Sequence, residues 1–332
     1  MIEVRDLSRQ YGVLKAVDRV SFDIGRREIV GLLGHNGAGK TTIMKMLTGF
    51  LEPSGGTIRI AGLDIAAPGR QGRRAVQRHI GYLPENCPLY PDMTVLDHLD
   101  YQAALRGISG TARAQAIRRA IARTALEAKA TAQVATMSRG YRQRLGVAQA
   151  ILHEPDILVL DEPTNGLDPS QIQHMRELIR ELAEAATVIV STHILQEVDA
   201  ICERVLIMRA GHLALDCKLG ELAGAPRLLV TLDQAEDSAR EALAAAEGVT
   251  DFERLAAKDG PTEQHSYALG TTDATALAPR IARLVNERGW SLYRLEPEQH
   301  DLEALFKAVS SAEPPVGAPA SARTTAPEVT HV

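Results

Sequence analysis

The chain has 332 residues and a formal net charge of −5, with 45% hydrophobic and 24% charged residues. This length allows about two domains and a sizeable core, and the charge gives no overall attraction to nucleic acid or to an anionic membrane surface. No apolar run approaches the roughly 20 residues of a membrane-spanning helix, and the first residues lack the pattern of an export signal. The three cysteines have neither disulfide-framework nor zinc-site spacing. We therefore expect a globular cytoplasmic protein.

The first 24 residues alternate between apolar and polar side chains, which predicts two or three antiparallel strands. Tyr11 stands between these strands, directly before a turn at Gly12. An aromatic ring at such a place can stack on a nucleotide base, and ordinary packing is the alternative.

A glycine-rich segment at residues 34–42 follows an apolar run and precedes a helical pattern, so it is predicted to link a strand to a helix. This is the arrangement of a phosphate-binding P-loop, in which backbone N–H groups and a helix N-terminus surround the phosphates. Lys40 is then expected to reach the β- and γ-phosphates, and Thr41 to bind Mg²⁺. The alternative is a glycine-rich turn that binds nothing. The candidate phosphate-binding residues are Gly34, His35, Asn36, Gly37, Ala38, Gly39, Lys40, Thr41 and Thr42.

Two further strands end in polar side chains that suit phosphate chemistry. Residues 157–160 are apolar on both faces, as in a parallel sheet, and lead into Asp161 and Glu162. Beside a P-loop, Asp161 is the expected Mg²⁺ anchor and Glu162 is placed to polarise a water molecule, although paired acids also cap helices. The strand at 187–191 ends at Thr192 and His193, and His193 can contact a γ-phosphate or serve as a structural histidine.

The intervening segments are mainly helical. Helices are predicted at 94–105, with Thr94 as N-cap, at 112–130 and at 145–152. The turn at 137–144 holds a Ser and a Gly at a helix start and is a candidate second anion site. The basic residues of 70–78 indicate a solvated helix face rather than a nucleic-acid surface. A helix at 170–183 and a hairpin at 205–215 complete this part of the chain.

The character of the sequence changes after about residue 219. Strands and helices are predicted in the order β-α-β-β-α-β up to residue 295, which is the ferredoxin-like pattern, followed by a helix at 301–309. Because these segments contain no catalytic constellation, a small regulatory or dimerising module is expected. The composition of residues 311–332 predicts a disordered tail.

Taken in this order, the motifs of residues 1–220 resemble the nucleotide-binding subunit of an ABC transporter. The resemblance implies an α/β P-loop NTPase of the ABC ATPase type, with a parallel core sheet, an antiparallel N-terminal subdomain and a helical subdomain. A ferredoxin-like α+β domain at 221–310 and the tail at 311–332 would follow. In this resemblance Tyr11 is the A-loop aromatic that stacks on adenine, residues 34–42 are Walker A, residues 157–162 are Walker B, Asp168 is the D-loop aspartate and His193 is the H-loop switch.

Two motifs depart from the usual pattern of that family. The signature Leu-Ser-Gly-Gly-Gln is replaced by residues 137–141, Met-Ser-Arg-Gly-Tyr. Ser138 and Gly140 are retained as donors to a γ-phosphate, whereas Tyr141 occupies the Gln position. The Q-loop Gln is replaced by Glu85, whose carboxylate can approach Mg²⁺. With the C-terminal module, these variants resemble the ATPases that serve ABC-2-type exporters, including those of gliding motility, copper or nitrous-oxide maturation, and drug efflux.

The resemblance implies a homodimer that closes head-to-tail around two ATP molecules and energises an integral-membrane ABC-2-type permease at the cytoplasmic face of the inner membrane. Glu162, His193 and Lys40 would be the catalytic residues, and Thr41, Asp161 and Glu85 would face Mg²⁺; no direct nucleic-acid contact is expected. An alternative is a soluble ABC-type ATPase acting on a ribosome or DNA complex, although this chain has neither two cassettes nor a long coiled coil. A P-loop kinase or GTPase and a purely structural adaptor fit the motifs less well, and the transported substrate stays open.

Overall fold

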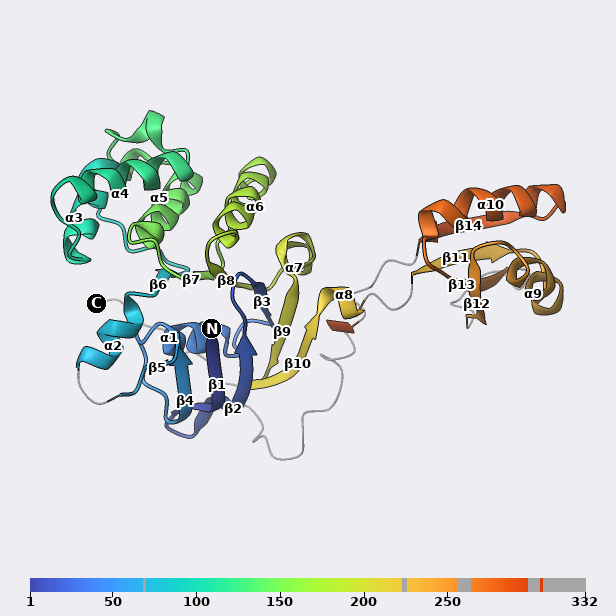
Figure 1. Cartoon of the computed structure of the whole chain (residues 1–332), viewed down its shortest axis with the longest axis horizontal. Helices are drawn as coiled ribbons and strands as arrows, with labels where there is room; N and C mark the ends of the chain where they lie inside the picture. Colours follow the sequence, from blue (N-terminus) through green and yellow to red (C-terminus); the bar gives the residue numbers. More distant parts are fainter. Residues whose placement is uncertain (68–69, 223–225, 256–263, 298–304, 307–332) are drawn as a thin grey trace, which may run out of the picture.

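The computed structural model describes residues 1–67, 70–222, 226–255, 264–297 and 305–306 (Figure 1).

The N-terminal strands form an antiparallel sheet. Strands β1 (Ile2–Tyr11) and β2 (Leu14–Ile24) pair with β4 (Gly55–Ile60) and β5 (Leu63–Asp64) in the order β2-β1-β4-β5. The alternation of buried and exposed side chains along β1 and β2 gives this sheet one apolar face, as the sequence predicts.

The central sheet has the order β10-β9-β3-β8-β7-β6. Its parallel strands are β3 (Ile29–Leu33), β6 (Ile80–Leu83), β7 (Ile157–Asp161), β8 (Thr187–Thr192) and β9 (Arg204–Arg209), and β10 (His212–Lys218) pairs antiparallel to β9. Every residue of β3, β7 and β8 is buried. Both faces of this sheet are therefore covered, which is why these strands read as continuous apolar runs.

Successive residues of β7 enter different hydrophobic cores. Ile157 and Val159 pack with the N-terminal sheet and with α1 (Lys40–Leu47). Leu158 and Leu160 pack on the opposite face with helices. Those helices are α3 (Val95–Leu105), α4 (Gly110–Arg123), α5 (Arg139–Ile151), α6 (Pro169–Ala183) and α7 (Leu195–Ile201). The six-stranded sheet is thus the middle layer of residues 1–220.

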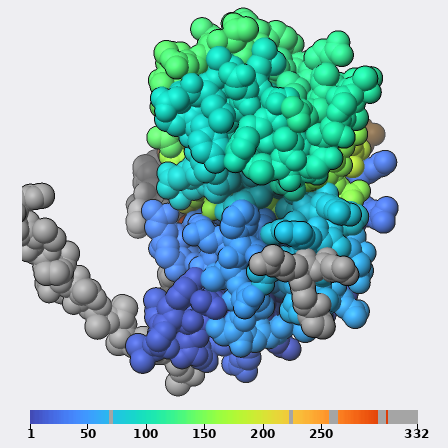
Figure 2. Space-filling view, turned by 90° about the vertical axis from the view of Figure 1, so that its left-hand side faces the viewer, coloured from blue at the N-terminus to red at the C-terminus, as the bar shows by residue number. Residues whose placement is uncertain are grey.

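Helices α3, α4 and α5 pack together as a lobe next to the strands (Figure 1). Figure 2 shows this lobe, in cyan and green, above the blue N-terminal part. Helix α3 begins as predicted, because the Thr94 hydroxyl accepts a hydrogen bond from the backbone N–H of Asp97. Helix α5 begins six residues earlier than the sequence prediction of 145, because Ser138 is its N-cap and the basic first turns belong to the helix.

The C-terminal strands form a sheet of their own. Strands β11 (Arg227–Leu232), β12 (Val249–Arg254), β13 (His265–Thr271) and β14 (Leu292–Pro297) are ordered β12-β13-β11-β14 and are antiparallel. With α9 (Glu236–Ala244) and α10 (Ala274–Glu287), this is the ferredoxin-like topology that the sequence predicts. Leu228, Val230 and Tyr267 on the sheet pack against Leu243 and Ile281 on the helices. The domain therefore has its own core.

The remaining elements are short. Helix α2 (Arg70–Gln77) precedes β6, the 3-10 helices η1 (Glu127–Lys129) and η2 (Val134–Thr136) lie between α4 and α5, and α8 (Leu219–Leu222) follows β10. Of the predicted helix at 301–309, only residues 305 and 306 lie among the described residues, and the predicted tail at 311–332 lies outside them. None of the helices in the described ranges has the length and apolarity to cross a bilayer.

Candidate functional site

The P-loop lies between β3 and α1, and close backbone approach requires two of its glycines, Gly34 and Gly39. A Cβ atom at Gly34 would lie 2.5 Å from the Met208 carbonyl oxygen. Gly39 caps α1 with φ +104, a conformation that side chains disfavour, and a Cβ atom there would lie 2.6 Å from the Ala16 carbonyl oxygen. The loop closes through a hydrogen bond from Ala38 N–H to the His35 carbonyl. This loop conformation can therefore place an anion at the N-terminal end of α1.

Lys40 places its ammonium group inside this loop. Its Nζ donates to the carbonyl oxygens of Gly34 at 2.7 Å and His35 at 3.4 Å, and lies 3.9 Å from Glu162 Oε1. Burial lowers the pKa of Lys40, and the neighbouring carboxylates of Glu162, Asp161 and Glu85 oppose that shift. This positive charge lies at the point where the loop would receive phosphates.

Glu162 follows β7 in a strained conformation. Its φ of +50° is uncommon for a residue with a side chain and costs on the order of 1 to 2 kcal/mol. The backbone N–H of Glu162 donates to the Ser191 carbonyl at 3.1 Å, and Glu162 Oε2 lies 2.9 Å from His193 Nδ1. Burial raises the pKa of the Glu162 carboxyl, and the contacts with His193 and Lys40 oppose the rise. A carboxylate with a raised pKa that is oriented by a histidine suits a general base.

Asp161 has one satisfied oxygen and one unsatisfied oxygen. Its Oδ1 accepts a hydrogen bond from the Ser191 hydroxyl, whereas its buried Oδ2 has no hydrogen-bond partner among the described residues. Thr41 is adjacent to Lys40, and a carboxylate with a hydroxyl is a donor set that suits Mg²⁺. The part of the chain that the structure describes holds no cluster of three or more His, Cys, Asp or Glu side chains.

The other residues predicted to bind the nucleotide differ in exposure and in their contacts. Glu85 is exposed just beyond β6 and is close enough to act electrostatically on Lys40. Asn36 and Gly37 are exposed on the P-loop, and Thr42 lies in the first turn of α1. Tyr11 is 46% exposed at the end of β1, with the Arg9 guanidinium 4.8 Å from its ring centre. A ring with this exposure is accessible for stacking.

The signature residues lie at the start of α5. Ser138 caps this helix, and Gly140 is buried. Tyr141 is half-buried against the core, with Lys129 Nζ 5.6 Å and the Arg144 guanidinium 5.9 Å from its ring centre. The ring is thus held by contacts of its own chain. Asp168 caps α6 by accepting a hydrogen bond from Gln171 N–H at 2.9 Å.

Three contributors were not predicted from the sequence. The Ser191 hydroxyl is hydrogen-bonded to both the Asp161 carboxylate and the Glu162 backbone N–H. The sequence feature that could have indicated this role is its position near the end of a buried strand. Arg139 packs on Gly166, which lies in the turn at residues 165–168 that ends at Asp168 and is called the D-loop turn below. The Phe306 ring lies 5.0 Å from the His35 ring, so the chain returns to the P-loop after the ferredoxin-like domain. No local pattern marks the last two contacts.

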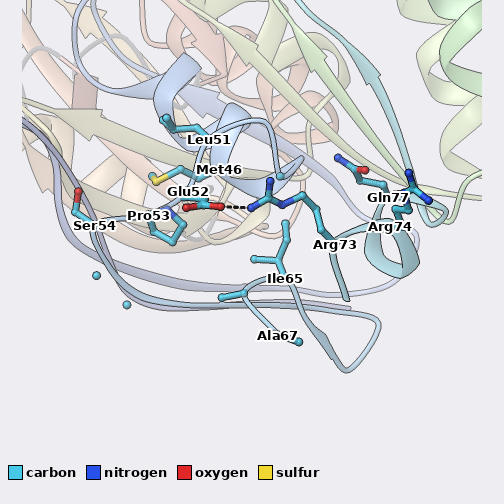
Figure 3. Close-up of a pocket in the computed structure, with 14 residues that line it drawn as sticks. Met46, Leu51, Glu52, Pro53, Ser54, Ile65, Ala67, Arg73, Arg74 and Gln77 are labelled. Carbon is cyan, nitrogen blue, oxygen red and sulfur yellow. Dashed lines mark hydrogen bonds and ion pairs between the residues drawn. The ribbon is translucent and has the colours of Figure 1, made fainter. Parts of the chain in front are cut away.

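A cavity of about 650 Å³ lies beyond the end of α1 (Figure 3). Arg73 of α2 forms an ion pair with Glu52 across it, and Arg74 and Gln77 also line it. Part of the basic segment expected to be a solvated helix face therefore borders this hollow. The lining includes none of the P-loop or Walker B residues, so the cavity is separate from the nucleotide centre.

Comparison with known proteins places the chain in a family. Residues 17–165 match the family model described as ABC transporter. The chain is 30% identical over 309 residues to the bacitracin transport ATP-binding protein BcrA of Enterococcus faecalis, a match that covers 92% of this chain and 95% of that protein. The chain belongs to the ABC transporter ATP-binding proteins.

Other relatives agree with this assignment. The ABC ATPase is 37% identical over 230 residues to the Nod factor export ATP-binding protein I of Burkholderia orbicola (strain AU 1054), which covers 69% of this chain and 72% of the relative. A solved ATP-binding subunit of an ABC transporter matches with a TM-score of 0.60 and 32% identity, over 67% of this chain and 92% of that one. The predicted fold class, an ABC-type P-loop ATPase with an α/β core, is therefore confirmed.

Proposed function

We propose that this ABC ATPase hydrolyses ATP to drive an ABC-2-type exporter. The observation that carries the proposal is the contact between Lys40, Glu162 and His193 at the ends of β7 and β8, beside the P-loop. These groups combine a phosphate-binding cation with a base and a histidine that orients it. The relatives named for bacitracin transport and Nod factor export support export as the direction.

Each residue has a distinct part in the proposed reaction. Glu162 accepts a proton from the attacking water, aided by its raised pKa, and His193 holds its carboxylate in place. Lys40 neutralises charge on the terminal phosphates, and the exposed ring of Tyr11 stacks on adenine. Thr41 and Asp161, with Glu85 nearby, would hold Mg²⁺, which supplies charge neutralisation at the β- and γ-phosphates.

We further propose that two copies of the chain close head-to-tail. Each chain contains one P-loop and one signature turn, and in this chain Gly140 of the signature turn packs on Gln171 of α6. In the dimer, Ser138 and Gly140 of each copy would face the ATP held by the other. Glu162 in each P-loop site would then act only when the partner has closed.

The permease is proposed to dock beside the Glu85 segment. A cleft of about 230 Å³ there is lined mainly by apolar and aromatic groups. Phe50 at its edge is 72% exposed, and Tyr82, Pro84 and Arg106 form its walls. An apolar cleft is a candidate interaction surface, and the exposed Phe50 extends its apolar lining. A short helix of a membrane partner at the cytoplasmic face would fit this cleft.

The test uses the Glu162→Gln variant, which keeps the shape of the side chain and removes the base. ATP hydrolysis should fall by about a hundredfold or more. With ATP and Mg²⁺, light scattering during gel filtration should show the mass rise from 35.9 kDa to twice that value. The control is Glu162→Gln combined with Lys40→Ala, which should stay monomeric because it loses the phosphate-binding cation. A Glu162→Gln protein that remains monomeric with ATP would refute dimer closure.

The partner is tested separately by affinity purification of Glu162→Gln from detergent-solubilised membranes. Recovery of an integral-membrane protein would support the permease if it is lost in Phe50→Asp and kept in Leu63→Asp, an exposed apolar residue of β5 that does not line this cleft. Recovery of ribosomal or DNA-bound proteins instead would support a soluble ABC ATPase and overturn the exporter proposal.

A further inference from the structure

Two glycine contacts join the signature turn to the D-loop side of the same chain. A Cβ atom at Gly166 would lie 2.6 Å from Arg139 Cζ and 2.7 Å from its Nη1, so the guanidinium rests directly on the glycine backbone. Gly140 makes a similarly close contact with the side-chain amide of Gln171, in the first turn of α6. Both contacts depend on the missing side chain of a glycine.

The D-loop turn is also connected to the catalytic carboxylate. Asn165 N–H donates to the Glu162 carbonyl at 3.2 Å, and Leu167 N–H donates to the Thr164 carbonyl at 3.1 Å. Gly166 has φ +71 and lies within this hydrogen-bonded turn, four residues after Glu162. A movement of Arg139 against Gly166 would therefore shift the backbone of this turn, which begins at Glu162.

We propose that Arg139 is a positioning residue that couples the two ATP sites of the dimer. The inference rests on the proposed head-to-tail closure, in which the signature turn of a chain covers the partner's ATP while Glu162 of that chain serves its own ATP. Arg139 then links the two events, because its guanidinium fixes the distance between the signature turn and the Glu162 turn. The family pattern has Gly at this position, which cannot make this link.

A planar guanidinium suits this role for a physical reason. It is flat and rigid, so it covers a backbone surface, whereas a lysine ammonium is a point charge on a flexible stem. The proposal therefore predicts that shape matters more than charge. Arg139→Ala and Arg139→Lys should both weaken the coupling, although the lysine keeps the charge.

The experiment measures ATP hydrolysis by the full-length chain as a function of ATP concentration. Both Arg139 variants should lower kcat by about tenfold and reduce the Hill coefficient from near two, the number of sites, toward one. The affinity of the monomer for a fluorescent ATP analogue should change by less than about twofold, because the P-loop is untouched. Arg142→Ala, three residues further along α5 and also exposed, is the matched control and should leave all three quantities unchanged.

A double-mutant cycle removes the effect of backbone strain. Gly166→Ala adds a Cβ atom at a positive φ in either background, but it displaces a guanidinium only when Arg139 is present. Gly166→Ala should therefore lower kcat by a smaller factor in the Arg139→Ala background than in the wild type. Equal factors in the two backgrounds would overturn the proposal, as would an Arg139→Lys enzyme with wild-type kcat and Hill coefficient.

The two proposals fail in different ways. If dimer closure is wrong, Glu162→Gln stays monomeric with ATP and the wild type shows no cooperativity. If only the role of Arg139 is wrong, Glu162→Gln dimerises and the wild type is cooperative, but the Arg139 variants keep the wild-type Hill coefficient.

Discussion

Ser191→Ala is the substitution that most directly tests how the catalytic carboxylates are held. The Ser191 hydroxyl donates to Asp161 Oδ1 and accepts a hydrogen bond from Glu162 N–H at 3.2 Å. Both Ser191 and Asp161 are almost fully buried. Since Asp161 Oδ2 has no hydrogen-bond partner among the described residues, alanine at 191 leaves this buried carboxylate without a hydroxyl donor.

The size of the effect follows from the loss of one hydrogen bond to a charged group. Such a bond contributes about 1.5 to 3 kcal/mol, so the free energy of unfolding without nucleotide should fall by about 2 kcal/mol. Because Asp161 also loses its orientation, kcat/KM for ATP should fall by about tenfold, and half-maximal activity should need more Mg²⁺. Bound MgATP should restore part of the lost stability, since it gives Asp161 a new partner.

The assay is urea unfolding with and without MgATP, together with steady-state hydrolysis at varied Mg²⁺. Thr187→Val is the control, because Thr187 begins the same strand. The Thr187 hydroxyl donates to the Gly25 carbonyl and accepts from Arg27 N–H, both at 3.0 Å, and valine removes both hydrogen bonds. It should be destabilised to a similar extent with an unchanged Mg²⁺ requirement. If Ser191→Ala unfolds earlier but hydrolyses ATP like Thr187→Val, the hydroxyl serves the fold alone and the reasoning about Asp161 is wrong.

Three further outcomes are expected. Gly34→Ala should weaken ATP binding by at least about tenfold in a fluorescent-nucleotide titration, because the added Cβ atom would lie 2.5 Å from the Met208 carbonyl oxygen. The circular dichroism spectrum should stay native. Unchanged affinity would show that the loop can shift. Tyr11→Ala should cost about 1 to 3 kcal/mol of ATP affinity and Tyr11→Phe almost none, whereas equal losses would exclude stacking. Burial, with a smaller effect of Arg106, lowers the pKa of His153 from 6.5 to about 4. Between pH 6.5 and about pH 4, the unfolded chain therefore binds a proton at His153 that the folded chain does not bind. The free energy of unfolding should therefore fall as the pH is lowered through that window, and His153→Gln should flatten the dependence measured by urea unfolding at several pH values.

The sequence was sufficient where the signal is local. The strand, glycine loop and helix around Lys40 are defined by neighbouring residues, and Thr94 is a cap whose partner is three residues away. The start of α5 was misplaced because the prediction followed the apolar residues from Leu145 onward, whereas the first two turns carry Arg139, Arg142 and Arg144. Ser138, as an N-cap, was the better signal.

The sequence was insufficient where two distant segments meet. Asp161 and Ser191 are neighbours because β7 and β8 pair in parallel with these residues in register, and strand order cannot be read from either strand alone. The contact of Arg139 with Gly166 depends on how α5 packs against the D-loop turn. The sequence shows Arg139 where the family pattern has glycine, but it does not show that Arg139 contacts Gly166.

The contact between Phe306 and His35 has a practical consequence for dissecting this chain. Phe306 comes after the last strand of the ferredoxin-like domain, and Leu305 and Phe306 both pack on the core that the central sheet shares with its helices. A protein shortened to end near residue 220 would therefore lose an aromatic neighbour of Walker A as well as the accessory domain. Excising residues 227–297 and rejoining the flanking segments with a linker is the deletion that keeps this neighbour and isolates the contribution of the domain.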